Sequence, residues 1–255
     1  MSDPANKKID ILTDEIVQKE ETTNFDTTVI KEMAENGVMY GHRKARTQPR
    51  FKSFIFTTRN GIEIIDLPKT LQAIETVAEF FNKQIAEKKT VLLVGVQPSS
   101  WNAVESFAKK YGFAYIKNGW IGGLITNFKI IYQRLEHFRK LQKDMDKGEL
   151  EKYTKKERVV IGRSIEKMRG MFEGLETMTK VPDVVFVIDT SIKNHMTALK
   201  EAKLSKIPVV AIIDSDDNPD LVDFPIPAND HSKMSIEWVM NNLANRLQST
   251  DNSAK

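Results

Sequence analysis

Short apolar runs, separated by stretches of helical periodicity, form the most regular pattern in this 255-residue chain from residue 91 onward. Runs of this kind are typical of strands buried on both faces of a parallel sheet, and the helical stretches between them supply the crossovers. The pattern predicts a three-layer α/β domain with a flavodoxin-like parallel sheet, for which the strand order 2-1-3-4-5 is suitable although the pattern does not fix it. The five predicted strands are residues 91–94, 114–116, 184–188, 209–213 and 224–226, and the accompanying helices are residues 102–110, 193–204 and 232–247.

The N-terminal third follows a different pattern. Residues 1–24 are polar and are predicted to be a flexible tail, as are residues 248–255, so that one α/β domain spans residues 25–247. A helix should end at Gly37, and a basic loop should follow it. Residues 53–58 and 62–66 are β-rich runs joined by Arg59-Asn60-Gly61, and Asn-Gly is a strong signal for an antiparallel β-hairpin. Asp66 is then predicted to cap a helix that has Pro68 in its first turn.

More than sixty residues separate the second predicted strand from the third, which is too long for an ordinary crossover. Apolar residues alternate at spacings of three and four in two stretches of this segment, and Thr154 with Glu157 forms a capping-box signature between them. The segment at residues 124–176 is therefore predicted to be an inserted antiparallel coiled-coil helical hairpin. Its two seams are Leu124, Phe128, Ile131, Leu135 and Phe138, and Ile161, Ile165, Met168, Phe172 and Leu175.

Composition excludes several classes of protein. The chain has no cysteine, which rules out disulfides, thiolate zinc sites and a cysteine nucleophile. No apolar run approaches the roughly 20 residues of a membrane-spanning helix, and no secretory signal begins the chain, so a cytoplasmic protein is expected. The four histidines, His42, His137, His195 and His231, are scattered along the sequence, which argues against a histidine-rich metal site.

The formal net charge is only +3, but the charges are unevenly distributed. Residues 36–62 contain six Lys and Arg and no acid, and residues 129–169 contain thirteen Lys and Arg against seven acids. Residues 183–230 instead contain nine acids and four lysines. The distribution predicts a basic surface confined to the first two thirds of the chain, which suits a polyanion partner. The alternative is a solvated charged face, and this alternative is stronger for the hairpin than for residues 36–62.

An enzyme of flavodoxin-like architecture is the main alternative function. Such an enzyme would bind a nucleotide or phosphate at the carboxyl ends of its strands, using Ser99, Asp189 and Asp214, and the two aspartates could bind Mg²⁺. However, neither G-x-G-x-x-G nor G-x-x-x-x-G-K-[ST] is present, and Asp189 directly precedes a helix that it could cap. No residue is nominated as a nucleophile, and no cofactor or metal is expected.

Several motifs of the chain resemble those of the bacterial ribosomal protein S-two family. The first set comprises Gly37-Val38-Met39-Tyr40-Gly41-His42, Pro49-Arg50-Phe51-Lys52, Arg59-Asn60-Gly61 and Ile64-Ile65-Asp66-Leu67. The later set comprises Trp120-Ile121-Gly122-Gly123, Thr126-Asn127, Ile188-Asp189, Ile207-Pro208-Val209, Ile213-Asp214, Asn218-Pro219-Asp220 and Ile226-Pro227-Ala228-Asn229-Asp230. The similarity covers residues 26–247, and the combination of motifs is highly specific.

This resemblance implies a structural constituent of the small ribosomal subunit that has no enzymatic activity and no small-molecule substrate. It also implies binding to ribosomal RNA, contact with neighbouring small-subunit proteins, and help in anchoring the mRNA-binding protein S-one. The residues expected to bind RNA are His42, Arg43, Lys44, Arg46, Arg50, Lys52, Arg59, Trp120, Asn127, Lys129, Arg134, Arg158 and Arg163. Without the resemblance, the sequence around Trp120 favours a buried indole ring, although the ring could also stack on a base.

Two positions depart from the family pattern. Gly119 stands where an arginine usually precedes the tryptophan, and Gln97-Pro98 stands where Lys or Arg usually follows the glycine after the first sheet strand. Both departures remove expected phosphate contacts at the edge of the sheet, whereas residues 36–62 keep theirs. A third hypothesis is an RNA-binding adaptor that acts away from ribosomes, and sedimentation with or without small subunits distinguishes it from a ribosomal component.

Overall fold

Five parallel strands form the central sheet in the computed structural model, which describes residues 27–248. The strands are β4 (Val91–Val94), β5 (Ala114–Ile116), β6 (Val184–Ile188), β7 (Val209–Ile213) and β8 (Phe224–Pro227), in the spatial order β5-β4-β6-β7-β8. All five were predicted within one residue. Counted along the chain the order is 2-1-3-4-5, so the flavodoxin-like arrangement is confirmed.

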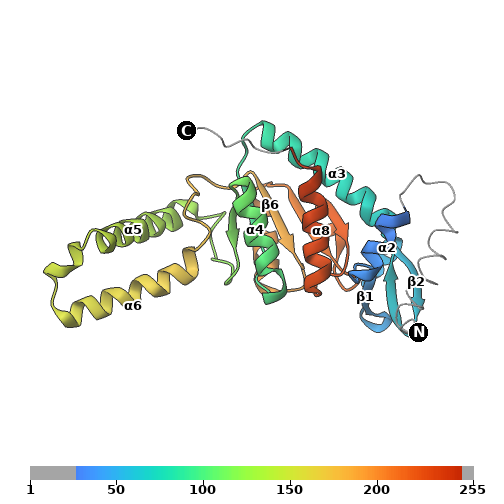
Figure 1. Cartoon of the computed structure of the whole chain (residues 1–255), viewed down its shortest axis with the longest axis horizontal. Helices are drawn as coiled ribbons and strands as arrows, with labels where there is room; N and C mark the ends of the chain where they lie inside the picture. The colour runs from blue at the N-terminus through green and yellow to red at the C-terminus, as the bar shows by residue number, and fades with distance from the viewer. Residues whose placement is uncertain (1–26, 249–255) are drawn as a thin grey trace.

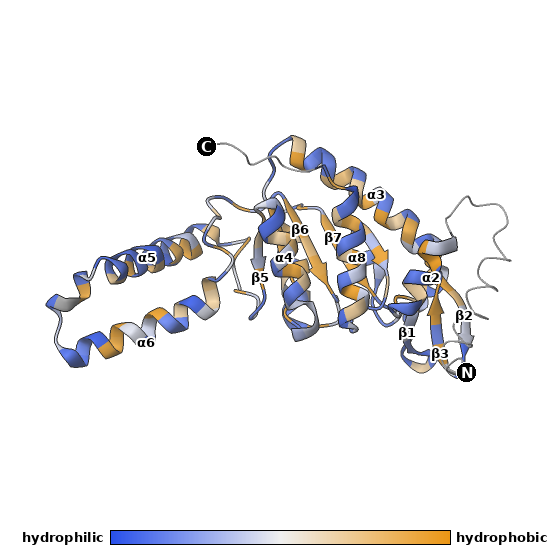
Figure 2. Cartoon of the chain, viewed as in Figure 1, coloured by the Kyte–Doolittle hydropathy of each residue, from blue (hydrophilic) through white to orange (hydrophobic). Residues whose placement is uncertain are grey.

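The two faces of the sheet are covered differently. Helices α3 (Leu67–Ala86), α4 (Trp101–Tyr111) and α8 (Lys233–Arg246), with the shorter α2 (Thr27–Glu35), pack on one face (Figure 1). Helix α7 (Lys193–Leu204) and the base of the helical hairpin pack on the other. On β6, Phe186 and Ile188 point to the first layer whereas Val185 and Val187 point to the second. The central strands β6 and β7 therefore consist of apolar residues throughout, and Figure 2 shows them as orange arrows.

A second, antiparallel sheet lies at the N-terminal end. It contains β1 (Tyr40–Arg43), β2 (Ile55–Arg59) and β3 (Ile62–Ile65) in the order β1-β3-β2. The predicted hairpin of β2 and β3 is confirmed, and its turn residues Asn60 and Gly61 have φ angles of 52° and 75°. The prediction of a continuous basic loop after Gly37 was wrong, because β1 pairs with β3. The short helices η1 (Lys44–Arg46) and η2 (Pro49–Phe54) occupy the rest of that loop.

The inserted segment forms two helices, α5 (Phe128–Asp146) and α6 (Lys155–Phe172), joined by η4 (Glu149–Lys152). They project away from the sheet as an antiparallel pair (Figure 1). The Thr154–Glu157 capping box is confirmed at the start of α6, and the rings of Phe138 and Phe172 lie 5.9 Å apart between the helices. Leu124 and Leu175 are buried in the same apolar cluster, although both lie outside the helices.

Asp66 precedes α3 as predicted, but its carboxylate makes no capping hydrogen bond and instead lies 2.9 Å from Nζ of Lys69. The predicted flexible tails lie outside the described residues, except that Gln248 is described and its N–H donates to Asn82. Among the helices that the structure describes, none combines the length and the apolar character needed to cross a membrane.

Candidate nucleic-acid interface

The basic loop, which we define as residues 41–59, presents its cations on a fixed scaffold. Phe51 of η2 is fully buried in the apolar cluster beneath the sheet, and the N–H of Gln48 donates to the carbonyl of Ser215 over 2.8 Å. These contacts hold η1 and η2 at the carboxyl edge of the parallel sheet. The side chains of Arg43, Lys44, Arg46, Arg50 and Lys52 are exposed, whereas Arg59 on β2 is half-buried.

Arg50 of the basic loop forms an ion pair with Asp220. Asp220 belongs to η5 (Pro219–Leu221), which leads into β8. Because both side chains are about half exposed, the pair is weak and a phosphate could replace the carboxylate. The pair therefore positions the Arg50 guanidinium without removing it from a partner's reach.

His42 occupies a different environment from the rest of the basic loop. Its Nδ1 lies 2.9 Å from Oδ2 of Asp214, and its backbone N–H donates to Oγ of Ser215 over 2.7 Å. The hydrogen bond to Asp214 raises the pKa of His42 above its ordinary value of 6.5, against the opposing effect of burial. A Cβ at Gly41 would lie 2.8 Å from Oγ of Ser215, so this close approach requires glycine. The structure thus places His42 in the group of carboxylates described next, and its contact with RNA stays a prediction.

A group of aspartates lies at the carboxyl ends of β6, β7 and β8. Asp189, Asp214, Asp217 and Asp230 are each no more than 2% exposed. Burial raises the pKa of Asp217 to about 6 despite a hydrogen bond from Thr190. Burial, together with the charges of Asp189, Asp217 and Asp214, raises the pKa of Asp230 well above its ordinary value. We call these four residues the aspartate cluster, and within residues 27–248 their recorded ion pairs are with histidines and not with Lys or Arg.

The aspartate cluster and two histidines together offer a set of metal ligands. The ligand atoms of His42, Asp214 and His231 lie within 4.8 Å of one another, as do those of Asp189, Asp230 and His231. Oδ2 of Asp230 is buried and receives no hydrogen bond, which leaves a lone pair for a cation. Imidazole nitrogens with carboxylate oxygens suit Zn²⁺. The four histidines are scattered along the sequence, but the fold brings the rings of His42 and His231 to 4.9 Å.

The loop that the enzyme hypothesis assigned to a phosphate is occupied by groups of the protein. The N–H of Val96 donates to Nε2 of His195, and the side chain of Gln97 donates to Asp189 and to the carbonyl of Asp230. Ser99 donates to Gln97 and does not join Asp189 and Asp214. Asp189 receives hydrogen bonds from Ser191 in a turn and does not cap α7, so its predicted capping role was wrong. These contacts leave no free phosphate cradle at residues 96–100.

Trp120 lies in a turn that Glu201 of α7 holds in place. The indole N–H of Trp120 donates to Oε1 of Glu201 over 3.0 Å, and the backbone N–H of Gly123 donates to the same oxygen over 2.8 Å. The N–H groups of Ile125 and Thr126 and the hydroxyl of Thr126 donate to Oε2. Burial raises the pKa of Glu201, but these hydrogen bonds outweigh it and the net pKa is lowered. Sequence reasoning missed Glu201, because no local pattern marks a glutamate whose partners lie about eighty residues earlier.

The remaining predicted RNA-binding residues lie on or beside the helical hairpin. Trp120 is half-buried, with its N–H already used, and Asn127 is exposed immediately before α5. Lys129 and Arg134 on α5, and Arg158 and Arg163 on α6, are exposed. Elsewhere on the hairpin, Arg139 and Arg169 pair with glutamates three residues earlier. The four predicted cations are therefore available to a partner, and their role stays a prediction.

Comparison with known proteins agrees with this architecture. The family model described as "Ribosomal protein S2" matches residues 33–250. The small ribosomal subunit protein uS2 of Petrotoga mobilis is 38% identical over 218 residues, which cover 86% of this chain and 75% of that protein. The corresponding protein of Dictyoglomus thermophilum is 38% identical over 86% of this chain and 88% of its own length. Protein uS2c of Cyanophora paradoxa is 36% identical over 86% of this chain and 93% of its own length. With its fold and most of its length matched in this way, the chain belongs to the ribosomal protein S2 family.

Proposed function

We propose that this chain binds ribosomal RNA in the small subunit through the basic loop and the helical hairpin. Its family makes it a structural component of the small ribosomal subunit and not an enzyme. The observation that carries the RNA proposal is the exposure of Arg43, Lys44 and Arg46 on a loop that is fixed to the sheet. Guanidinium and ammonium groups held in this way bind phosphate oxygens and position a folded RNA without reading its bases.

The hairpin extends the proposed interface away from the sheet. Lys129 and Arg134 lie near the base of the hairpin, and Arg158 and Arg163 lie on the returning helix. RNA helices are recognised mainly by shape and by backbone contacts, which suits a long projecting element with separated charges. We therefore assign the basic loop and the hairpin to different segments of folded RNA.

A salt titration of RNA binding tests the proposal. A triple variant with Arg43→Ala, Arg46→Ala and Arg50→Ala should bind small-subunit RNA more weakly. The slope of log affinity against log salt should also become shallower by about one for each lost phosphate contact. The matched control replaces Lys31, Lys83 and Lys110, which are exposed on α2, α3 and α4. Equal behaviour of the two variants would refute the role of the basic loop.

Further partners belong to the same proposal. Through its family resemblance, the chain is proposed to contact neighbouring small-subunit proteins and to help anchor the mRNA-binding protein S-one. Sedimentation through a sucrose gradient tests the setting, because a ribosomal component comigrates with small subunits at moderate salt. A free RNA-binding adaptor would remain at the top of the gradient. Loss of S-one from subunits that lack this chain, with recovery on adding it back, is the expected result for anchoring.

A further inference from the structure

The fold reverses the charge that the C-terminal third presents to solvent. Residues 183–230 contain nine acids and four lysines, so sequence analysis excluded this region from the basic surface. The structure shows that all four lysines are exposed. Lys193, Lys200 and Lys203 lie on α7, and Lys206 follows that helix. The only acid within α7, Glu201, is buried and binds the Trp120 turn.

Most of the nine acids face the interior. The four members of the aspartate cluster and Glu201 are buried, and Asp216 is half-buried near His42. Asp183 is half-buried and receives hydrogen bonds from Lys180 and from the N–H of Thr90. The exposed acids, Asp220 and Asp223, are paired with Arg50 and with the N–H of Val209. A partner that approaches α7 therefore meets ammonium groups and few free carboxylates.

The lysines of α7 have no competing partner among the described residues. No carboxylate of residues 27–248 lies within ion-pairing distance of Lys193, Lys200, Lys203 or Lys206. On a helix that rises 1.5 Å per residue, Lys200 lies about 10 Å and Lys203 about 15 Å from Lys193 along the axis, and seven-residue spacing returns to nearly the same side. The face is thus a line of separate, unpaired charges.

Helix α7 lies between the two surfaces already assigned to RNA. At one side Glu201 joins it to the Trp120 turn, which leads directly into α5 and Lys129. At its end, Lys203 and Lys206 line a hollow together with Asp220, the ion-pair partner of Arg50. Phe51 of the basic loop, Leu199 of α7 and Phe128 of α5 all pack on one apolar cluster beneath the same face of the sheet. The three elements are therefore neighbours on one side of the molecule.

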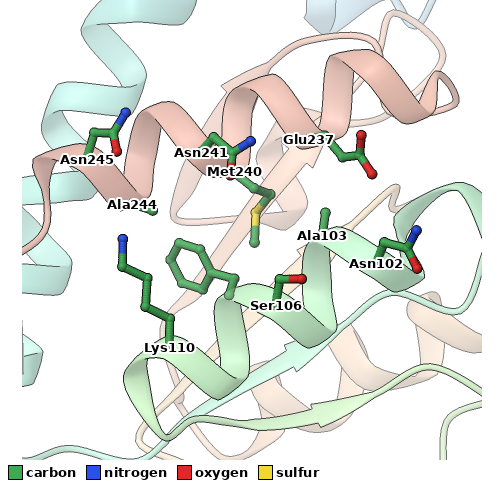
Figure 3. A pocket seen from close by; sticks show the side chains of 10 residues that line it. Asn102, Ala103, Ser106, Lys110, Glu237, Met240, Asn241, Ala244 and Asn245 are labelled. Atoms are coloured by element: carbon green, nitrogen blue, oxygen red, sulfur yellow. The ribbon is translucent and has the colours of Figure 1, made fainter. Parts of the chain in front are cut away.

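The opposite face has a different character. Figure 3 shows the groove between α4 and α8, whose walls carry the amides of Asn102, Asn241 and Asn245. Lys110 and Glu237, which also line this groove, have opposite charges. The α4–α8 groove therefore carries charges of both signs, whereas the described part of α7 exposes lysines and no acid.

We infer that the lysines of α7 form a third RNA contact, which joins the basic loop to the base of the hairpin in one continuous phosphate-binding surface. The inference rests on the proposed function, because it assumes that the loop and the hairpin bind RNA. A polyanionic backbone suits this face, since each ammonium is a point charge that can neutralise one phosphate. An acidic protein segment is the competing partner, and the experiment separates the two.

The test uses the full chain and three triple variants. The first variant removes the α7 charges by Lys200→Gln, Lys203→Gln and Lys206→Gln. The second removes the loop charges by Arg43→Ala, Arg46→Ala and Arg50→Ala. The control variant carries Lys31→Gln, Lys83→Gln and Lys110→Gln. Affinity for small-subunit ribosomal RNA is measured between about 0.05 and 0.2 M salt. The α7 variant should bind about tenfold more weakly at the lower salt, with a slope shallower by about two to three. The control should leave both quantities unchanged, and melting temperatures should show that all variants are folded.

The outcomes distinguish a failure of the α7 inference from a failure of the proposed function. If the α7 variant matches the control while the loop variant binds weakly, the inference is overturned and the proposed function stands. If neither variant differs from the control, both are overturned. If the α7 variant keeps its RNA affinity but loses binding to a purified small-subunit protein, the partner is a protein and the inference is overturned.

Discussion

Glu201 and the aspartate cluster are both buried carboxylate sites beside the same sheet, but their surroundings have opposite effects on the charge. Glu201 accepts hydrogen bonds from the indole of Trp120, from three backbone N–H groups and from the hydroxyl of Thr126. The aspartate cluster places several carboxylates near one another, and Oδ2 of Asp230 has no hydrogen-bond partner. The pKa of Glu201 is lowered, whereas the pKa values of Asp217 and Asp230 are raised.

The difference shows that burial alone does not fix the charge of a carboxylate, because hydrogen-bond donors outweigh desolvation at Glu201 whereas desolvation prevails at Asp217 and Asp230. At neutral pH the Glu201 carboxylate stabilises the folded state, because the unfolded chain cannot offer the same five donors. Asp217 and Asp230 destabilise the folded state at that pH, since ionising or protonating a carboxyl with a raised pKa costs free energy there. Glu201 thus acts as a structural anchor, whereas Asp230 keeps one unsatisfied oxygen that a cation can stabilise.

The largest expected effect is that of Glu201→Ala, which leaves buried N–H donors without an acceptor. We expect the free energy of unfolding to fall by about 3 kcal/mol in chemical denaturation. The matched control is Glu79→Ala on α3, an exposed position, where a change below about 0.5 kcal/mol is expected. A Glu201→Ala variant as stable as the control would show that the Trp120 turn does not depend on this carboxylate.

The pH dependence of the same variant follows from the lowered pKa of Glu201. The unfolded chain titrates near the ordinary value of 4.5, so the contribution of Glu201 is fully present above that pH and is lost as the pH falls through the lower folded pKa. The destabilisation by Glu201→Ala should therefore be constant from about pH 6 to 8 and shrink below about pH 4. A difference that grows on acidification would contradict this assignment.

Zn²⁺ should stabilise the protein by binding one of the two ligand sets that share His231, which contain either His42 and Asp214 or Asp189 and Asp230. At a free concentration about one hundred times the dissociation constant, mass action gives about 2.7 kcal/mol, which is seen as a higher melting temperature. His231→Ala should abolish the response, because both ligand sets contain His231, and the control His137→Ala, exposed on α5, should retain it. An equal response from His231→Ala would place the ion elsewhere.

Asp230→Asn should raise stability when no divalent cation is present. The folded pKa of Asp230 lies well above its ordinary 3.8, so its cost is fully present above the folded pKa and disappears as the pH falls toward the unfolded value. Measured with a chelator, the variant should exceed the parent by about 1 kcal/mol at about pH 8 and by much less at about pH 5. A variant that is less stable than the parent at both pH values would show that the Asp230 carboxylate is satisfied.

The smallest effect is expected for Trp120→Phe, which removes one of the five donors to Glu201 and keeps an aromatic ring. A loss of about 0.5 to 1 kcal/mol is expected, since the backbone donors and Thr126 remain. If Trp120 also stacks on RNA, phenylalanine should preserve most of that contact while Trp120→Ala weakens RNA binding further. Equal RNA affinity of the two variants would limit Trp120 to a structural role.

Local pattern predicted most elements of the fold. The five sheet strands, the β-hairpin of β2 and β3, and the capping box of α6 depend on periodicity and on residues within one or two turns, which sequence records directly. Strand β1 was missed because its four residues, Tyr40–Arg43, show no apolar alternation and pair with β3 about twenty residues later. The motifs that carry the family resemblance were also readable in order along the chain.

What the sequence by itself determined is the set of elements, their buried stripes and the family. Only the tertiary structure decided which charged groups meet. It pairs His42 with Asp214 and His231, gives Glu201 to the Trp120 turn, and leaves the lysines of α7 exposed while the neighbouring acids are buried. The physical reason is that helix and strand formation depend on near neighbours. The state of a charge depends on burial and on partners that parallel strands bring to one edge from distant parts of the chain.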